Sequence, residues 1–155
     1  MVEPPKEVGP GTVPALPPPP KPAGQYASVA IENGWAWVSG QIVTRDGKAD
    51  PAGLVGREIS VEAAREVAGR AALQALSALS EALGSLERVR RIVRLSVYVA
   101  SPPGFDRAHE VANGASERLF DHLGEGRGRG SRIALGVAGL PLNAPVEVDL
   151  VAAID

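Results

Sequence analysis

Two charged residues near the C-terminus have types and surroundings suited to chemistry on a small anion. Arg132 and Glu147 each stand in a short apolar segment, and Leu140-Pro141 separates the two segments. A guanidinium is always ionised and binds a carboxylate through two parallel hydrogen bonds. A glutamate whose pKa is raised by partial burial and by a neighbouring carboxylate, here Asp149, can take a proton from water near neutral pH. The two residues could therefore anchor a carboxylate and activate a water molecule.

Spacing alone does not require such a site. A strand-end arginine commonly pairs with an exposed acid, and on spacing alone this is the favoured explanation of Arg132. Glu147 and Asp149 fit the solvated polar face of an edge strand equally well. Tyr26 at a strand start and Ser39 in a hairpin are more simply explained by packing and by backbone hydrogen bonding.

The elements that must position these residues follow the order β-β-α-β-α-β-β. Asn33-Gly34 is a hairpin turn signal between two extended segments. A first helix is expected to start after Ser60 as its N-cap and to end at Gly84. The remaining ranges follow from alternation and helical periodicity: strands over 27–32, 35–42, 93–99, 132–137 and 146–153, a second helix over about 105–123, and a loop over 124–130.

Two helices can cover only one face of a five-stranded sheet. In the second strand, Trp35, Trp37, Ser39 and Gln41 are expected to share one face. The uncovered face is predicted to carry several large side chains among its polar groups, namely Trp35, Trp37, Ile92, Tyr98 and Val151. A face of this kind predicts a homo-oligomer whose interface lies on it.

Composition narrows the class of protein. The chain has 18 acidic and 16 basic residues. The resulting net charge of -2 argues against nucleic acid or an anionic membrane as a partner. The absence of cysteine excludes disulfides, thiolate metal sites and cysteine nucleophiles. His109 and His122 lack metal-ligand spacing, and no phosphate-binding glycine motif follows a strand. We therefore predict no metal and no cofactor, and, without a signal core or an apolar run of ~20 residues, a soluble cytoplasmic location.

The N-terminal residues differ in composition from the rest. Residues 1–24 contain most of the prolines, including Pro17 to Pro20. We predict a Pro-rich arm over 1–24 that wraps a surface or stays loose, followed by one domain over 25–155. Binding of the arm to another protein module is the weaker alternative.

Several motifs resemble those of the RidA/YjgF family of reactive-intermediate deaminases, also called endoribonuclease L-PSP. The C-terminal segment is similar to the family pattern of Arg, a small residue, two alternating Val residues, Leu-Pro and then Val-Glu-Ile-Glu, whose last part reads Val146-Glu147-Val148-Asp149 here. Val38-Ser39-Gly40-Gln41 is similar to the Ser-Gly-Gln motif, and Tyr26 precedes Ser39 by 13 positions (39 minus 26), as in the family. The resemblance covers 22–155, and stretches 113–116 and 140–148 are similar to one branch of uncertain substrate.

The resemblance implies a fold, an assembly and a reaction. The fold would be chorismate-mutase-like α+β with two helices on one face of the sheet, assembled as a homotrimer with sites in clefts between subunits. The reaction would be hydrolysis of enamines and 2-imino acids to 2-keto acids and ammonia. Arg132 would grip the substrate carboxylate, and Glu147 would hold or activate the attacking water. Substrate would also meet a second group of residues: Tyr26, Ser39, Gly40, Asn113 and Ala134, the last offering only its backbone N–H where many relatives have cysteine.

Two alternatives stay open from sequence. The same arginine could serve a non-catalytic, regulatory protein that binds a small carboxylate such as a keto acid. An endoribonuclease or RNA-binding role could use Arg127 and Arg129 in the glycine-rich loop, but no stacking aromatic stands beside them. A flexible lid is the favoured interpretation of that loop.

Overall fold

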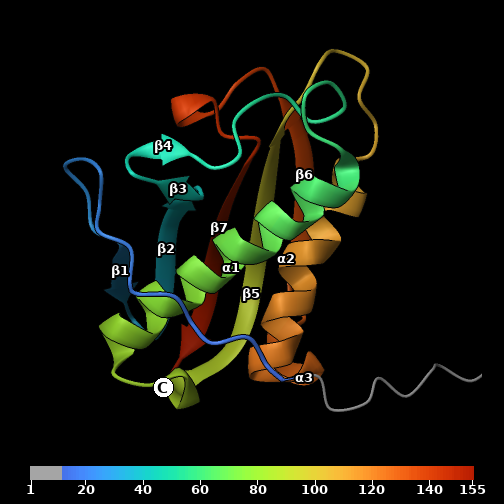
Figure 1. Ribbon diagram of the computed structural model, residues 1–155. Helices are drawn as coiled ribbons and strands as arrows, with labels where there is room; N and C mark the ends of the chain where they lie inside the picture. Colours follow the sequence, from blue (N-terminus) through green and yellow to red (C-terminus); the bar gives the residue numbers. More distant parts are fainter. Residues whose placement is uncertain (1–11) are drawn as a thin grey trace, which may run out of the picture.

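The computed structural model describes residues 12–155, so the first 11 residues of the predicted arm lie outside the described part. The element order confirms the predicted α+β class (Figure 1). The strands are β1 (Val29–Glu32), β2 (Trp35–Gln41), β3 (Thr44–Arg45), β4 (Lys48–Ala49), β5 (Val89–Ala100), β6 (Ser131–Val137) and β7 (Val146–Ile154). The helices are α1 (Val61–Leu83), α2 (Ala108–Leu123) and α3 (Glu125–Gly128), with 3-10 turns η1 (Leu86–Arg88) and η2 (Pro141–Asn143).

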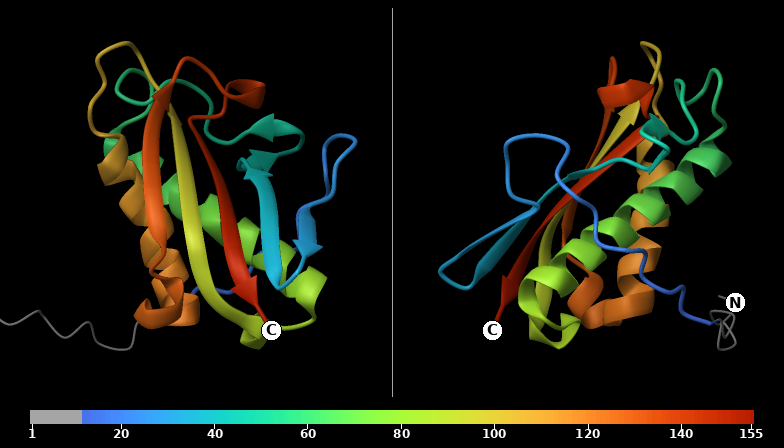
Figure 2. Two further views of the ribbon diagram at one scale, coloured as in Figure 1. Left: turned by 180° about the vertical axis from the view of Figure 1, so that it is seen from behind. Right: turned by 60° about the vertical axis from the view of Figure 1, so that its left-hand side comes forward.

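A five-stranded sheet with the order β1-β2-β7-β5-β6 forms the centre of the fold. β5 and β6 are parallel, and every other neighbouring pair is antiparallel. Helices α1 and α2 lie on one face of this sheet, and within residues 12–155 no helix lies on the other (Figure 2). The prediction that two helices cover a single face is therefore confirmed.

Helix α1 forms where its sequence pattern predicts. The Ser60 side chain accepts a hydrogen bond from the Ala63 amide at 3.1 Å, and Gly84 ends the helix in the left-handed conformation with φ of 80°. The predicted alanine-rich stripe is buried against the sheet, because small side chains let the helix backbone approach it closely. Its members are Ala64, Ala68, Ala71, Ala75, Leu79 and Leu83.

The two long helices approach each other most closely at a pair of glycines. A Cβ atom on Gly114 of α2 would overlap the backbone carbonyl oxygen of Arg65 on α1. Gly69 on α1 faces the same crossing, since its nearest neighbours include the Gly114 carbonyl oxygen. Because both glycines lack side chains, α2 can pack closely on α1 at this crossing. The position of α2 matters for function because this helix carries part of the candidate site.

Irregularities in two strands correct the predicted faces. A register shift between Val38 and Gln41 places Gln41 opposite Val148, so Gln41 is buried on the helix-covered face rather than beside Trp35. Another shift in β5 places Ile92 opposite Ala152, where it is fully buried beneath the helices. The prediction that both side chains lie on the uncovered face was wrong, because one extra residue in a strand reverses the alternation beyond it.

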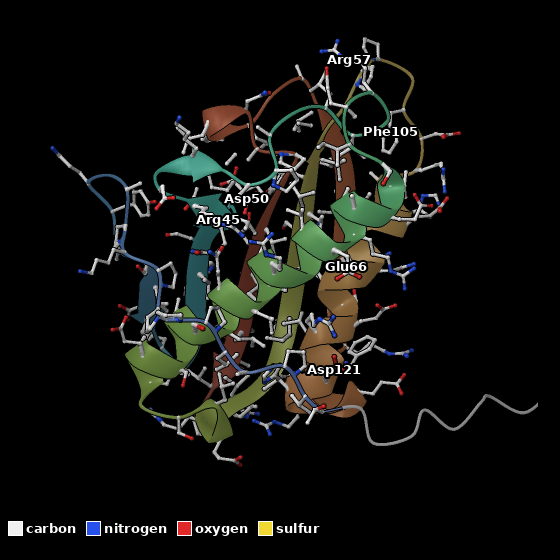
Figure 3. All side chains as sticks on the ribbon, viewed as in Figure 1. Arg45, Asp50, Arg57, Glu66, Phe105 and Asp121 are labelled. Atoms are coloured by element: carbon white, nitrogen blue, oxygen red, sulfur yellow. The ribbon has the colours of Figure 1, made fainter. Side chains whose placement is uncertain are left out.

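Other boundaries also differ from the prediction. The second helix starts at Ala108 rather than near 105, and the segment 124–130, predicted as a loop, contains α3. The turn after β2 forms the small β3–β4 hairpin. An ion pair of 3.1 Å between Arg45 and Asp50 joins the two sides of this hairpin (Figure 3).

Within the described part of the arm, residues 12–24 run across α1 (Figure 1). The Ser77 hydroxyl on α1 donates to the Pro17 carbonyl oxygen at 2.6 Å, and Leu16 packs against the core. This part of the arm therefore wraps a surface of its own chain.

The uncovered face presents large apolar side chains to solvent. Trp35 and Trp37 are 40% and 46% exposed, with ring centres 6.5 Å apart, and Leu135 on β6 is 42% exposed. Half-buried Val151 lies opposite Trp37 on this face. Of the predicted apolar members, only Ile92 is absent from it.

No helix formed by residues 12–155 has the length and apolar character needed to cross a membrane.

The glycine crossing gives a test of the packing. We expect Gly114→Ala to lower the free energy of unfolding by about 2 kcal/mol, since separating packed helices outweighs the roughly 1 kcal/mol that alanine gains in a helix. Gly126→Ala is the matched control, because a Cβ atom there meets nothing within 4 Å. Urea unfolding at equal protein concentration measures both. Equal stabilities of the two variants would contradict the close approach.

Candidate functional site

Arg132 is held by helix α2. It lies on the edge strand β6, opposite Leu95, on the helix-covered face. Its Nη1 donates to Asn113 Oδ1 at 2.9 Å and to Ser116 Oγ at 3.1 Å, and its Nη2 donates to the His109 carbonyl oxygen at 3.3 Å. Asn113 and Ser116 are one helical turn apart, so their side chains lie on the same face of α2.

These contacts leave part of the guanidinium free. A guanidinium has five N–H donors, and within residues 12–155 three of them are used, two of these from Nη1. The remaining two belong to Nε and Nη2, the pair that can bind both oxygens of one carboxylate. The three bonds to α2 also fix the plane of the group. Arg132 is therefore oriented for a carboxylate ligand and exposed to receive it.

A cavity of about 260 Å³ lies beside this arginine, between α2 and the start of β6. Phe120 and Leu95 give it an apolar side, and Arg129 lines it together with Arg132. The cavity also borders the two glycines of the 124–130 segment that precede β6. Its complete lining is Leu95, Asn113, Ser116, Phe120, Gly128, Arg129, Gly130 and Arg132.

The arginines of the 124–130 segment are engaged within the chain. Arg127 donates to the backbone oxygens of Val89 and Leu86 at 2.9 and 2.7 Å. Arg129 pairs with Glu125 and lies 5.6 Å from the centre of the Phe120 ring. Both guanidinium groups thus have intramolecular partners, which weakens the RNA alternative that the sequence left open.

Glu147 lies on the other face of the sheet. It is on β7 opposite Tyr98, whereas Arg132 lies opposite Leu95, and positions 95 and 98 of β5 face opposite ways. The Glu147 side chain is half-buried, and within residues 12–155 it has no hydrogen bond or ion pair. Burial and, secondarily, the negative charge of Asp149 raise its pKa above the ordinary carboxyl value. Such a group is suited to exchanging protons at higher pH than a solvated glutamate.

Gly40 makes room for this carboxylate. A Cβ atom on Gly40 would overlap Glu147 Oε1, so any larger residue would displace the acid. The register shift in β2 occurs at the same place, between Val38 and Gln41. The Ser-Gly-Gln motif therefore has a steric reason: it puts a bare backbone beside Glu147.

The structure places Tyr26 and Ser39 near Gly40 but gives them local hydrogen bonds. Ser39 Oγ donates to the Ala27 carbonyl oxygen at 2.7 Å, and Tyr26 Oη accepts from the Ala23 amide at 3.3 Å. Tyr26 is 51% exposed and, with Gly40, lines a cavity of about 220 Å³. Tyr26 is therefore accessible to a ligand, whereas the Ser39 hydroxyl is occupied by backbone, as its position in the hairpin also predicts.

Asn113 and Ala134 belong to the Arg132 side of the structure. Asn113 contacts the guanidinium directly, and Ala134 lies opposite Val97 on the helix-covered face, packed against the core. A single chain therefore places most of the predicted site residues in two groups on opposite faces of the sheet. The first group is Arg132, Asn113 and Ala134, and the second is Glu147, Gly40 and Ser39. Tyr26 precedes β1 and shares its cavity with Gly40 and with Gln74 of α1.

Two residues that contribute to the site, Ser116 and Tyr98, were not predicted from the sequence. Ser116 shares the Arg132 guanidinium with Asn113, and helical spacing of three residues was the available signal. Tyr98 Oη donates to Asp149 Oδ2 at 3.0 Å, although the sequence indicated only an aromatic residue on the uncovered face. That second contact depends on strand register, for which the sequence contained no local signal.

Residues 12–155 contain no cluster of three or more His, Cys, Asp or Glu side chains placed to hold a metal ion.

Known proteins are similar to this chain in sequence and in structure. A model of the family described as Endoribonuclease L-PSP matches residues 18–154. Protein TCP17 of Trypanosoma cruzi is 41% identical over 128 residues, which cover 83% of this chain and 80% of that protein. The structure of Atu1372 from Agrobacterium tumefaciens, a protein of unknown function, is 41% identical and has a TM-score of 0.81, with 86% of this chain and 84% of that one covered.

A proposed endoribonuclease of Shewanella oneidensis MR-1 has a similar structure with a TM-score of 0.84 at 28% identity, covering 90% of this chain and 92% of that one. The range that the family model matches includes all seven site residues predicted above.

The raised pKa of Glu147 makes a testable statement about stability. Between the ordinary carboxyl pKa and the raised value, the folded protein binds more protons than the unfolded chain, so the free energy of unfolding falls as pH rises through that window. Glu147→Gln removes the titrating carboxyl and therefore removes this fall in the free energy of unfolding. We expect the variant to be more stable than wild type at pH 7.5, and the gain to shrink toward zero at pH 4.

Urea unfolding at both pH values measures this difference. Glu81→Gln, at an exposed position near the end of α1, is the control and should show no such pH-dependent gain. A gain for Glu147→Gln that is equal at pH 4 and pH 7.5 would count against a raised pKa.

Proposed function

Because the chain belongs to the endoribonuclease L-PSP family, also known as the RidA/YjgF family, we propose that it hydrolyses reactive 2-imino acids and enamines to 2-keto acids and ammonia. The observation that carries the proposal is the state of Arg132. Three bonds to α2 orient its guanidinium, and two N–H donors remain for a carboxylate. A 2-imino acid has that carboxylate directly beside its reactive carbon.

The residues supply the few functions that the reaction needs. Arg132 binds the carboxylate and so fixes the position of the adjacent C=N bond. Glu147, with its raised pKa and no partner within residues 12–155, takes a proton from water as the oxygen attacks the imine carbon. The same carboxyl returns this proton to nitrogen, which gives a carbinolamine bearing a hydroxyl and an amino group. Glu147 then moves the hydroxyl proton to the amino nitrogen as well, so the C–N bond breaks, ammonia leaves and the C=O bond forms. No electron acceptor is required, because carbon keeps its oxidation state.

The site that performs this reaction is proposed to lie between subunits. In one chain Arg132 and Glu147 lie on opposite faces of the sheet, so they can meet only if they come from two chains. The uncovered face provides exposed Trp35, Trp37 and Leu135 for such an assembly. We therefore propose a homotrimer with three clefts, each with Arg132 from one subunit and Glu147 from its neighbour.

Substitutions at the two residues test the reaction. An amino-acid oxidase generates 2-iminopropanoate or 2-iminobutanoate in situ, and wild type should accelerate the release of ammonia and keto acid. Arg132→Ala should lower kcat/KM by roughly 10²–10³-fold through loss of two charge-assisted bonds, and Glu147→Gln should lower kcat by roughly 10²–10⁴-fold. Arg90→Ala, at an exposed residue away from Arg132, should keep wild-type activity.

The outcomes separate the candidate functions. Lack of acceleration by a folded wild-type oligomer with several precursors would contradict the deaminase proposal. Keto-acid binding that depends on Arg132 but is unaffected by Glu147→Gln would then indicate a carboxylate-binding protein. Cleavage or binding of RNA that falls steeply with salt would indicate the nucleic-acid alternative.

Mixing two inactive variants tests the shared cleft. Arg132→Ala and Glu147→Gln subunits are unfolded together, refolded and compared with each variant refolded alone. If each cleft takes one residue from each of two chains, random assembly restores about a quarter of the clefts, and activity should return to that fraction. Mixed subunits that stay inactive while forming trimers would contradict a site between subunits.

A further inference from the structure

A hydrogen-bonded pair lies next to Glu147 on the uncovered face. Tyr98 Oη on β5 donates to Asp149 Oδ2 on β7 at 3.0 Å. Asp149 is two residues from Glu147 and therefore points to the same side of the sheet, and Tyr98 is the direct cross-strand neighbour of Glu147. The Tyr98 hydroxyl thus donates to Asp149 and not to Glu147, although Glu147 is its cross-strand neighbour.

We propose that Tyr98 is a positioning residue that acts through Asp149 to hold Glu147 ready for proton transfer. The inference rests on the proposed function for its catalytic meaning, but the coupling between the three side chains can be tested without turnover.

Two carboxylates, those of Glu147 and Asp149, lie on one face of the sheet. Two unrestrained acids at neighbouring positions can turn toward each other and share one proton, because both charges together are unfavourable. A shared proton would occupy Glu147 and prevent it from accepting one from water. The bond from Tyr98 fixes one oxygen of Asp149 toward β5, which keeps that oxygen from turning toward Glu147.

Tyr98 is suited to this task over the relevant pH range. Burial, followed by the hydrogen bond to Asp149, raises the pKa of Tyr98 above its ordinary value. The phenol therefore stays protonated while Glu147 titrates, and it can only donate to the carboxylate. Its direction in the hydrogen bond does not change when Glu147 gains or loses a proton.

The surroundings of Glu147 contain few other charges. On its own strand the neighbouring titratable residue on the same face is Asp149, and on β5 it is Tyr98. On the β2 side stands Gly40, which has no side chain to titrate. Arg94 lies farther along β5, opposite Val151. Among residues 12–155, Asp149 is accordingly the one charge that contributes to the raised pKa of Glu147, after burial.

Three variants test the pair by the titration of Glu147. In protein labelled with ¹³C at the side-chain carboxyl carbons, NMR follows the pH at which Glu147 takes up its proton. Asp149→Asn removes the neighbouring charge, so Glu147 should protonate at lower pH than in wild type. Tyr98→Phe frees Asp149 to share a proton, so Glu147 should protonate at higher pH. The double variant should match Asp149→Asn, because Tyr98 then has no acid to act through.

Kinetics give the second readout. Tyr98→Phe should lower kcat about tenfold at neutral pH and move the acid limb of the pH–rate profile upward, with KM unchanged because Arg132 binds the substrate. Asp149→Asn should move that limb downward. Asp46→Asn removes an exposed carboxylate in the β3–β4 turn that does not contribute to the raised pKa of Glu147, so it should change neither the titration nor the profile.

The titration of Glu147 gives the result that would overturn the inference. If Tyr98→Phe leaves the titration of Glu147 unchanged, or shifts it equally in the Asp149→Asn background, Tyr98 does not act through Asp149. Failure of the proposed function looks different, because wild type would then lack turnover while the titrations in the three variants still followed the expected directions.

Discussion

The pairing of β5 with β6 on one side and β7 on the other is the constraint on which the candidate site depends. Leu95 lies opposite Arg132, and Tyr98 lies opposite Glu147. Because positions 95 and 98 face opposite ways, this register sends the guanidinium beneath α2 and the carboxylate to the uncovered face. A shift of one residue in either pairing would place both groups on one face and remove the need for a second subunit.

The packing of α2 on α1 then determines how Arg132 is oriented. The glycine crossing at Gly69 and Gly114 sets the distance of α2 from α1, and α2 in turn provides Asn113 and Ser116 to orient Arg132. The guanidinium is therefore oriented before any ligand arrives, and such preorganisation reduces the entropy lost on binding. Precise helix packing and anion recognition are thus properties of the same element.

The acid half follows a different physical rule. The Glu147 carboxylate has space but no charged partner. Gly40 beside it offers only backbone, and within residues 12–155 no cation lies against the carboxylate. An unpaired, half-buried carboxylate lowers the stability of the fold at neutral pH, as its raised pKa indicates. Reactive proton-transfer groups commonly carry such a cost, because pairing the charge would also remove its reactivity.

Sequence by itself determined the order of the elements and the chemical types in the site. Periodicity located both long helices and the main strands, Ser60 and Gly84 marked the ends of α1, and the motifs pointed to Arg132 and Glu147. These are local properties, set by residues close together in the chain. Tertiary structure alone decided which face each side chain occupies, since a strand's side chains alternate and one irregular residue, as before Gln41, reverses every side chain beyond it. For that reason the contact between α2 and Arg132, the bond from Tyr98 to Asp149 and the separation of the two halves could not be read from spacing.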